Sequence, residues 1–422
     1  MVKNSKVNAL TIPLKKFIPI FFLEIIITST VGSLSTAISN HLISELKYAP
    51  WVGAIIVSLV SAGFLVFTLA FGHISDKFGQ RKVIIFIMIG RLGCSLFYLV
   101  PISSNIHLII FGFIFFFDGG ANGIFWPTIQ NLSVLTERFG GLTLKQKFLS
   151  GYNFSWNFGY IFGMFAGTII VFLFTFNYNV FYFNAFGLII GVIIAIFSTK
   201  SIFKFFNNDT LHGSNSQDTP PTKNSAPYIK DEQSSITPRL FKLPFYSILL
   251  VLLIHSLIDG VMTIFLTIKI DLINQDLYWV FLITLIKLFA QMVATMIFSF
   301  TKKNKIAKFI LISISMVAIS WILIILSNDL WTLALLLSIS GFAQGMIYVL
   351  MMNLISYRAR DKNSAKPFSY FQAMMSSGRM TGSLYFGLTT TIFLNLGVIF
   401  LILYIALNFI QFNMNLKYAS RN

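Results

Sequence analysis

Twelve long apolar stretches follow one another along this chain of 422 residues, and short polar segments separate them. Inside a bilayer the backbone polar groups must be bonded within the segment itself, so stretches of this length predict membrane-spanning helices. The predicted spans are 17–39, 50–71, 83–101, 107–135, 146–174, 179–198, 245–268, 277–298, 309–327, 330–356, 365–392 and 396–416. The sequence therefore predicts an all-α membrane protein with the lipid bilayer as its main surroundings.

Lysine and arginine occur mostly in every second polar segment. Of the 31 lysines and arginines, 26 lie on one side of the predicted membrane, and only Lys47 and Lys269 lie on the other. Positively charged loops are typical of the cytoplasmic side, so we expect both termini to be cytoplasmic. We also expect the cell membrane to be the location. The net charge of +17 is spread over these loops, which argues against nucleic acid as a partner.

Residues 199–244 interrupt the pattern, because this segment is rich in Asn, Ser, Thr, Pro and charged residues. Such a composition cannot bury a core and is typical of a flexible linker, here on the cytoplasmic side. The linker would divide the chain into an N-terminal six-helix bundle, residues 1–198, and a C-terminal six-helix bundle, residues 245–422.

The two predicted bundles carry related sequences. Gly119–Leu132 aligns with Gly341–Leu354 at a constant shift of 222 residues, with amides and aromatic residues in matching places. The aligned pairs include Gly119 and Gly341, Asn122 and Gln344, Trp126 and Tyr348, and, one span later, Gly159 and Gly378, and Gly163 and Gly382. Two parallel six-helix repeats are typical of membrane transporters.

The segment between the second and third spans reads GHISDKFGQRK. It resembles the loop signature of the major facilitator superfamily. The matching positions are Gly72, Asp76, Lys77, Gly79, Gln80, Arg81 and Lys82. The resemblance implies twelve transmembrane helices in two pseudo-symmetric six-helix bundles, transport by alternating access, and a monomer.

In that family the carboxylate of this loop holds the two halves together, partly against the N-terminus of the eleventh helix. Asp76 would take this role, and a negative charge at a helix N-terminus gains about 0.3–1 kcal/mol. The chain departs from the family pattern at Phe115, where many members have arginine, and at Met164, where antiporters have proline. We interpret the glycines of the fifth and eleventh spans as helix-packing residues: Gly159, Gly163, Gly167, Gly378 and Gly382.

Ionisable residues inside a membrane cost about 2.5–3.5 kcal/mol each, so we expect them to be paired or functional. Arg91 and Asp118 lie at nearly equal depth on adjacent antiparallel spans, which predicts a structural ion pair. Asp259 and Lys287 are related in the same way. His255 precedes Asp259 by four residues and shares its helix face, so a proton relay is one interpretation and simple packing is the other.

The remaining two charges, Glu24 and Arg379, have no evident sequence partner and lie on spans that line the cavity in the resembled family. Aromatic side chains and amides nearby suit a polar organic solute, although they also suit interhelical packing. The hypothesis for the substrate or ion pathway comprises Glu24, Asp118, Asn122, Trp126, Asn153, Trp156, His255, Asp259, Lys287, Gln344, Tyr348 and Arg379.

These patterns and the resemblance predict a secondary active transporter for a small polar or amphipathic organic solute. Protons are one candidate for the coupled ion, and a facilitator without coupling is another. We expect no catalytic residues, no metal and no cofactor, since the histidines outside the spans are isolated and no phosphate loop occurs. The alternatives are a non-transporting sensor or lipid scramblase on the same fold and, as a further class, an integral-membrane enzyme.

Overall fold

The structure is a computed structural model. It describes residues 14–197, 199–200 and 245–421, apart from residues 73, 103, 175–177, 300, 302–304, 363–365 and 391–393. The predicted linker, 199–244, lies outside the described residues except for its first two positions. Its flexibility and the two predicted boundaries between the three segments therefore stay predictions.

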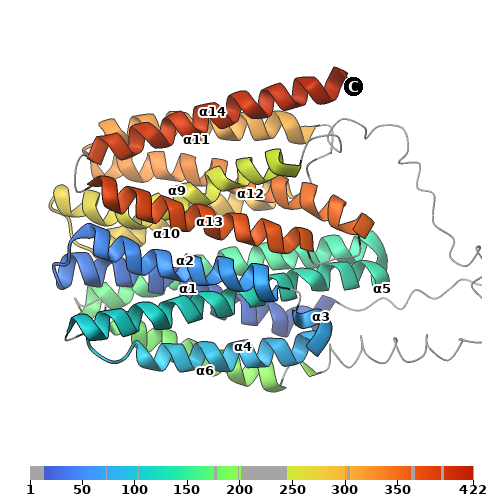
Figure 1. The fold of residues 1–422 in the computed structure, drawn as a ribbon, viewed down its shortest axis with the longest axis horizontal. Helices are drawn as coiled ribbons and strands as arrows, with labels where there is room; N and C mark the ends of the chain where they lie inside the picture. Colours follow the sequence, from blue (N-terminus) through green and yellow to red (C-terminus); the bar gives the residue numbers. More distant parts are fainter. Residues whose placement is uncertain are drawn as a thin grey trace, which may run out of the picture.

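Long helices run side by side through the molecule (Figure 1). Those of the first half are α1 (Ile18–Asn40), α2 (Pro50–Phe71), α4 (Gln80–Phe97), α5 (Asn105–Phe174) and α6 (Asn179–Phe197), with the short elements η1 (Leu14–Phe17), η2 (His41–Glu45) and α3 (Ile74–Phe78). Those of the second half are α9 (Phe245–Leu272), α10 (Tyr278–Phe298), α11 (Ile306–Leu326), α12 (Leu330–Lys362), α13 (Lys366–Thr390) and α14 (Leu394–Arg421).

Helix α5 contains two of the predicted spans. Its apolar parts are Asn105–Ser133 and Lys147–Phe174, and the backbone stays helical between them. The Gln130 side-chain amide donates a hydrogen bond to the Tyr152 hydroxyl at 2.8 Å, so the chain reverses direction within this element. With α5 counted as two crossings, the helices make the twelve crossings that the sequence predicted.

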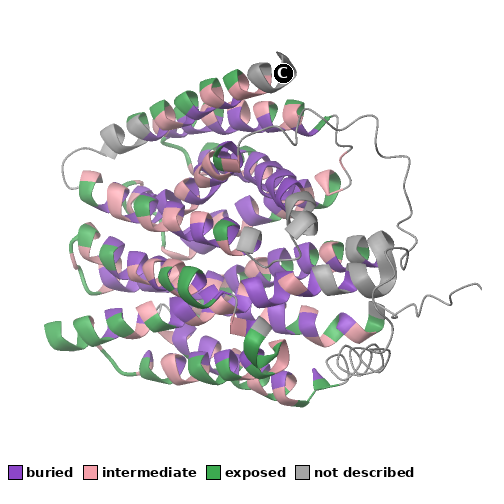
Figure 2. Ribbon diagram, turned by 45° about the vertical axis from the view of Figure 1, so that its right-hand side comes forward, coloured by how far each residue is buried: buried purple, intermediate pink, exposed green. Residues whose placement is uncertain are grey.

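In the described part of the chain, nine segments are long and apolar enough to cross a membrane by composition alone. The other three crossings are α4, α13 and α14, of which α14 includes a shorter apolar stretch, Leu401–Leu416. Helix α4 carries Arg81, Lys82 and Arg91, and α13 is rich in serine, threonine and glycine. Buried residues lie toward the middle of the bundle and many exposed ones on its outer faces (Figure 2). The outer faces carry large apolar side chains such as Phe86, as lipid contact requires.

Local chemistry accounts for several helix ends. Pro50 occupies the first turn of α2, where its missing N–H is not needed. Gly79 precedes α4 with φ of 83°, a backbone conformation that favours glycine. Helix α3 lies between these two helices, and the C-terminus of the chain lies at the same end of the bundle as α3 (Figure 1). We refer to this end as the α3 end.

Glycines bring the helices of each half together in matching ways. A Cβ on Gly163 of α5 would overlap the backbone carbonyl of Ser29 in α1, and one on Gly382 of α13 would overlap that of Leu257 in α9. Cβ atoms on the other predicted packing glycines would also meet neighbouring helices: Gly159 against Thr28 and Ile25, Gly167 against Phe281, and Gly378 against Ser256. Helices α5 and α1 thus pack in the first half as α13 and α9 pack in the second, which is the pseudo-symmetry predicted from the repeat.

The second repeat-related contact joins α5 to α2 and α12 to α10. Cβ atoms on Gly119 and Gly341 would overlap the carbonyls of Val60 and Lys287, respectively. The two halves contact each other where α2 packs against α13 and where α5 packs against α10. Within the halves, α4 packs on α5 and α6, and α11 packs on α12 and α14. Helices α4 and α11 therefore lie on the outer sides of their halves.

Replacing Gly163 by alanine should lower the free energy of unfolding by about 1–3 kcal/mol, because the added methyl group must push α5 away from α1. Gly90→Ala is the matched control, because nothing lies within 4 Å of a Cβ at that exposed position of α4. Thermal unfolding of the detergent-purified protein, followed by tryptophan fluorescence, measures both. Equal melting temperatures for the two variants would contradict the packing role.

Candidate functional site

Two cavities lie between the halves of the bundle. The larger has a volume of about 970 Å³, its open side included, and is lined by α1, α2, α5, α9, α10 and α13. The smaller, of about 440 Å³, lies closer to the α3 end. Three residues line both cavities and therefore lie between them: Trp156, Tyr160 and Arg379.

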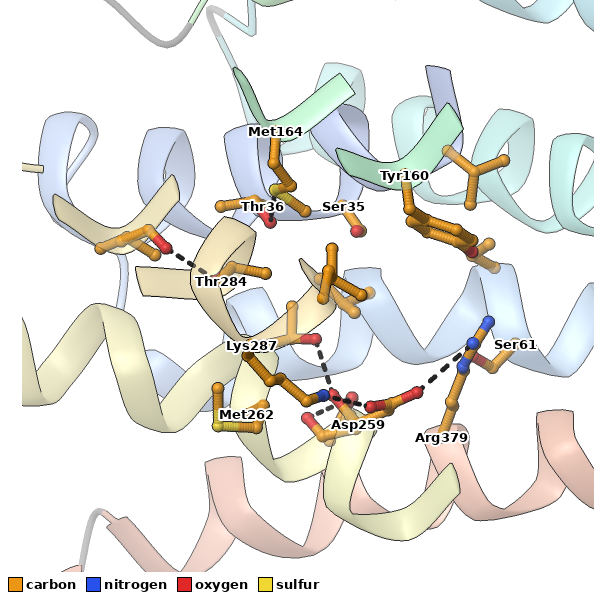
Figure 3. Close-up of a pocket in the computed structure, with 18 of the residues that line it drawn as sticks. Ser35, Thr36, Ser61, Tyr160, Met164, Asp259, Met262, Thr284, Lys287 and Arg379 are labelled. Carbon is orange, nitrogen blue, oxygen red and sulfur yellow. Dashed lines mark hydrogen bonds and ion pairs between the residues drawn. The ribbon is translucent and has the colours of Figure 1, made fainter. Parts of the chain in front are cut away.

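A cluster of charges projects into the larger cavity (Figure 3). The Lys287 ammonium group lies 2.5 Å from Asp259 Oδ1, and Arg379 Nη2 lies 3.5 Å from Asp259 Oδ2. The Lys287 side chain is 4% exposed and the Arg379 side chain 32% exposed. The pairing of Asp259 with Lys287 agrees with the depth argument, whereas no sequence pattern predicted Arg379 as a third member.

Close backbone packing positions these three side chains. A Cβ on Gly260 would overlap the carbonyl of Arg379, so α13 approaches α9 where Asp259 projects. Gly341 of α12 contacts the Lys287 backbone in the same manner. Charges in a low-dielectric interior must be paired closely, because each loses several kcal/mol of hydration, about 20 kcal/mol in the idealised limit.

His255 lies one helical turn before Asp259, with its Nε2 atom 3.7 Å from the carboxylate. The side chain is fully buried, and neither ring nitrogen has a hydrogen-bond partner in the described part of the molecule. Its ring lies 5.7 Å from that of Tyr348. The proposed proton relay through this pair stays a prediction.

Aromatic side chains from both halves surround the smaller cavity. Trp156 of α5 lies 4.9 Å from Tyr348 of α12 between ring centroids, and Trp126 lies 6.0 Å from Tyr152. Trp126, Trp156 and Tyr348 of the predicted pathway are therefore brought to one wall. The aromatic contacts narrow the space between the halves toward the α3 end.

The predicted amides are buried but are not among the described residues that line either cavity. Asn122 donates to the carbonyl of Asp118, and Gln344 donates to the Ser340 hydroxyl. Asn153 has a buried side-chain oxygen without a hydrogen-bond partner in the described part of the chain. These three side chains therefore do not contribute to the described cavity walls.

Glu24 lies inside the first half. Its carboxylate is fully buried and accepts a short hydrogen bond from the Ser155 hydroxyl of α5. Its Oε1 atom has no hydrogen-bond partner, and no Lys, Arg or His side chain pairs with it, among the residues that the structure describes. Glu24 is also not one of the described cavity-lining residues, so a direct contact with substrate is not what this conformation shows.

Arg91 and Asp118 form a separate buried pair. Arg91 Nε donates to Asp118 Oδ1 at 2.8 Å, and Arg91 Nη2 lies 3.4 Å from Thr30 Oγ1. The pair connects α4, α5 and α1 inside the first half, and neither residue lines the described cavities. The geometry favours the structural assignment of Asp118 over its alternative assignment to the pathway.

The loop motif lies where α2 meets α13. Gly72 is close to the first turn of α13, because a Cβ there would lie 2.6 Å from the Ser369 hydroxyl oxygen. Arg81 donates to the Ile196 carbonyl at the end of α6, and the side chains of Lys77 and Lys82 are exposed. The Asp76 side chain lies outside the described residues, so its contact with α13 stays a prediction.

Sequence reasoning missed several lining residues, among them Tyr160 and Gln291. Each follows a predicted residue by four positions, Tyr160 after Trp156 and Gln291 after Lys287. Residues four apart share a helix face, so this spacing was the signal that could have found them.

The family model described as "Major Facilitator Superfamily" matches residues 20–383. The chain belongs to the major facilitator superfamily. No curated protein matches the chain at a significant level. Among solved structures, a mutant of the nucleoside transporter NupG is similar, with a TM-score of 0.69, 12% identity, and coverage of 95% of this chain and 99% of that one.

A second similar structure comes from work on substrate recognition in proton-dependent oligopeptide transporters, with a TM-score of 0.65 and 10% identity. The similarity covers 97% of this chain and 98% of that one. At these identities the two structures show a shared fold.

Replacing Asp118 by asparagine should destabilise the protein by about 3–5 kcal/mol, because the buried Arg91 guanidinium would lose its counter-charge. Replacing both residues at once, Arg91→Met with Asp118→Leu, should cost less than the single change. Chemical unfolding of the purified protein measures the difference. If Asp118→Asn unfolds at the wild-type midpoint, the pair does not stabilise the first half.

Proposed function

We propose that this protein is a secondary active transporter that moves a small polar or amphipathic organic solute by alternating access. The observation that carries the proposal is the charged and aromatic cavity between the two halves of a superfamily fold. Lys287, Asp259 and Arg379 come from the second half, whereas Trp156 and Tyr160 come from the first. A solute bound there contacts both halves, as a rocking mechanism requires.

Contacts between the halves occur toward both ends of the cavity. At the end opposite α3, Thr267 donates to the Asn40 side-chain oxygen at 2.9 Å, and Ser39 donates to the Thr263 carbonyl at 3.1 Å. At the α3 end, Gly72 approaches Ser369. Entry of a solute from either side therefore requires one of these sets of contacts to separate.

The location, the orientation and the oligomeric state are further parts of the proposal. The distribution of positive loops supports both termini in the cytoplasm, and we propose the cell membrane as the location. We infer that the transporter acts as a monomer, as the family resemblance implies. Membership of the superfamily favours transport over catalysis, and the sensor and lipid-scramblase alternatives become outcomes of the experiments.

A reversible crosslink tests the proposed rocking motion. In a background with the single cysteine removed (Cys94→Ser), the pair Ser39→Cys and Thr267→Cys should form a disulfide, since the native hydroxyl oxygens are 3.4 Å apart. Oxidation should abolish solute uptake into proteoliposomes, and dithiothreitol should restore it. Radiolabelled nucleosides, dipeptides, amino acids and aromatic acids are suitable solutes for the screen.

The matched control joins two helices of the same half. Asn415 donates to the Ser247 hydroxyl at 2.7 Å, so cysteines at these positions crosslink α14 to α9 without joining the halves. Uptake should survive this disulfide. Full uptake with the Ser39–Thr267 crosslink formed would contradict the motion, and lipid scrambling without uptake of any solute would favour the scramblase.

We also propose Glu24 as the proton-carrying group. A buried carboxylate without a basic partner exchanges protons readily when its surroundings alternate between dry and aqueous. Glu24→Gln should abolish accumulation driven by a pH gradient but retain exchange of solute between the two sides. Ser155→Ala, which removes only the hydrogen bond to Glu24, should keep gradient-driven accumulation. Unchanged accumulation in Glu24→Gln would exclude this role.

A further inference from the structure

The larger cavity contains more positive than negative charge. Among the described residues that line it, the ionised side chains are Asp259, Lys287 and Arg379, so two cations face one carboxylate. An uncompensated cation in a low-dielectric site favours an anion as its partner. We propose that the solute carries a carboxylate that binds Arg379, attached to a flat aromatic body that lies against Trp156 and Tyr160. This inference rests on the proposed function and names its substrate class.

The geometry favours Arg379 over Lys287 as the anion-binding group. Lys287 is 2.5 Å from Asp259 and almost wholly buried, so its charge is already compensated. Arg379 approaches Asp259 only to 3.5 Å through one nitrogen and keeps 32% of its side chain exposed. A guanidinium has five N–H donors in a planar fork that matches a carboxylate. Its contacts with Asp259 and with the neutral Tyr160 hydroxyl leave several of these donors available.

A second donor lies beside Arg379 on the opposite half. Trp156 lines both cavities and is 6% exposed, and its indole nitrogen has no hydrogen-bond partner among the described residues. An indole N–H can only donate, so the group it is suited to meet is an acceptor. Tyr160 lies close to Arg379 (Figure 3), and its hydroxyl interacts with the guanidinium. Its ring and that of Trp156, 5.8 Å apart, offer the faces for an aromatic body.

Binding of such an acid would connect the two halves. The carboxylate would contact Arg379 on α13, while the aromatic body would contact Trp156 and Tyr160 on α5. Asp259 would keep its contact with Lys287 when Arg379 turns to the ligand. The bound anion therefore replaces one contact within the second half by contacts between the halves, which favours a conformation closed around the solute.

Matched pairs of acids and amides test the inference on the purified wild-type protein. Nicotinate is compared with nicotinamide, and indole-3-acetate with indole-3-acetamide, by thermal shift titration at constant ionic strength. Within a pair the ring is the same and only the charge differs. We expect the acid of at least one pair to bind about 10- to 100-fold more tightly than its amide, as a hydrogen bond to a charged group implies.

Variants identify the residue responsible. Arg379→Gln should remove the preference for the acid, and Arg379→Lys should retain part of it because the charge remains. Lys308→Gln, which removes an exposed positive charge on α11, should keep the full preference. Size-exclusion chromatography tests whether each variant is folded. The Arg379 variants should fold, because the pairing of Asp259 with Lys287 does not involve Arg379.

Three outcomes would overturn the inference: equal binding of acid and amide in both pairs, no binding by any of the four compounds, or an acid preference that survives Arg379→Gln. The proposed function is judged separately by uptake. If a neutral nucleoside or dipeptide accumulates in proteoliposomes while the acids do not bind, the proposed transport function is supported and the anion site is excluded. If an acid binds through Arg379 but no solute is taken up, the anion site is supported and the proposed transport function is contradicted.

Discussion

The cost of placing polar groups in a low-dielectric medium determines most of this structure. Backbone groups avoid that cost by forming helices, and ionisable side chains avoid it by pairing. Arg91 meets Asp118 within the first half, and Lys287 meets Asp259 at the cavity. Two of the described intramembrane charges depart from this rule: Arg379 is only loosely paired with a carboxylate, and the described surroundings of Glu24 include no cation. Both residues lie on helices at the interface between the halves, where alternating access would change the surroundings of each side chain.

Much of the fold could be predicted from the sequence, because the apolar stretches and the positive loops reflect physical constraints that act along the chain. Depth along adjacent antiparallel spans was enough to pair Arg91 with Asp118 and Asp259 with Lys287, since only a hairpin separates them. The loop motif identified the family that the family model shows.

Contacts between helices distant in sequence could not be predicted in this way. The approach of Arg379 to Asp259 depends on how α13 packs on α9, which the backbone contact at Gly260 determines. The burial of Glu24 beside Ser155 depends in the same way on the packing of α1 against α5. Periodicity alone does not determine how one helix is rotated against another, so only some of the residues that line the cavity could be predicted.

The internal repeat conserves packing but not chemistry. Val60 of α2 and Lys287 of α10 occupy matching places, since each contacts the first glycine of the repeated segment through its carbonyl. Phe64 and Gln291 also occupy matching places, because the Phe64 carbonyl contacts Gly123 and the Gln291 carbonyl contacts Gly345. The second half thus has charged and amide side chains where the first has apolar ones, and the cavity becomes asymmetric although the scaffold is not.

Helix α13 has a composition that is poorly suited to lipid, since it carries Arg379 and many small polar residues and is not one of the nine apolar candidates in the described chain. A segment of this kind gains little from entering a bilayer alone, because one arginine at the centre costs about 2.5–3.5 kcal/mol. Its partners α9 and α2 are both made earlier during synthesis. Biogenesis of the protein therefore depends on order: the earlier helices must already be in the membrane to receive α13, and a chain that ends before α13 would leave the interface of both halves open to lipid.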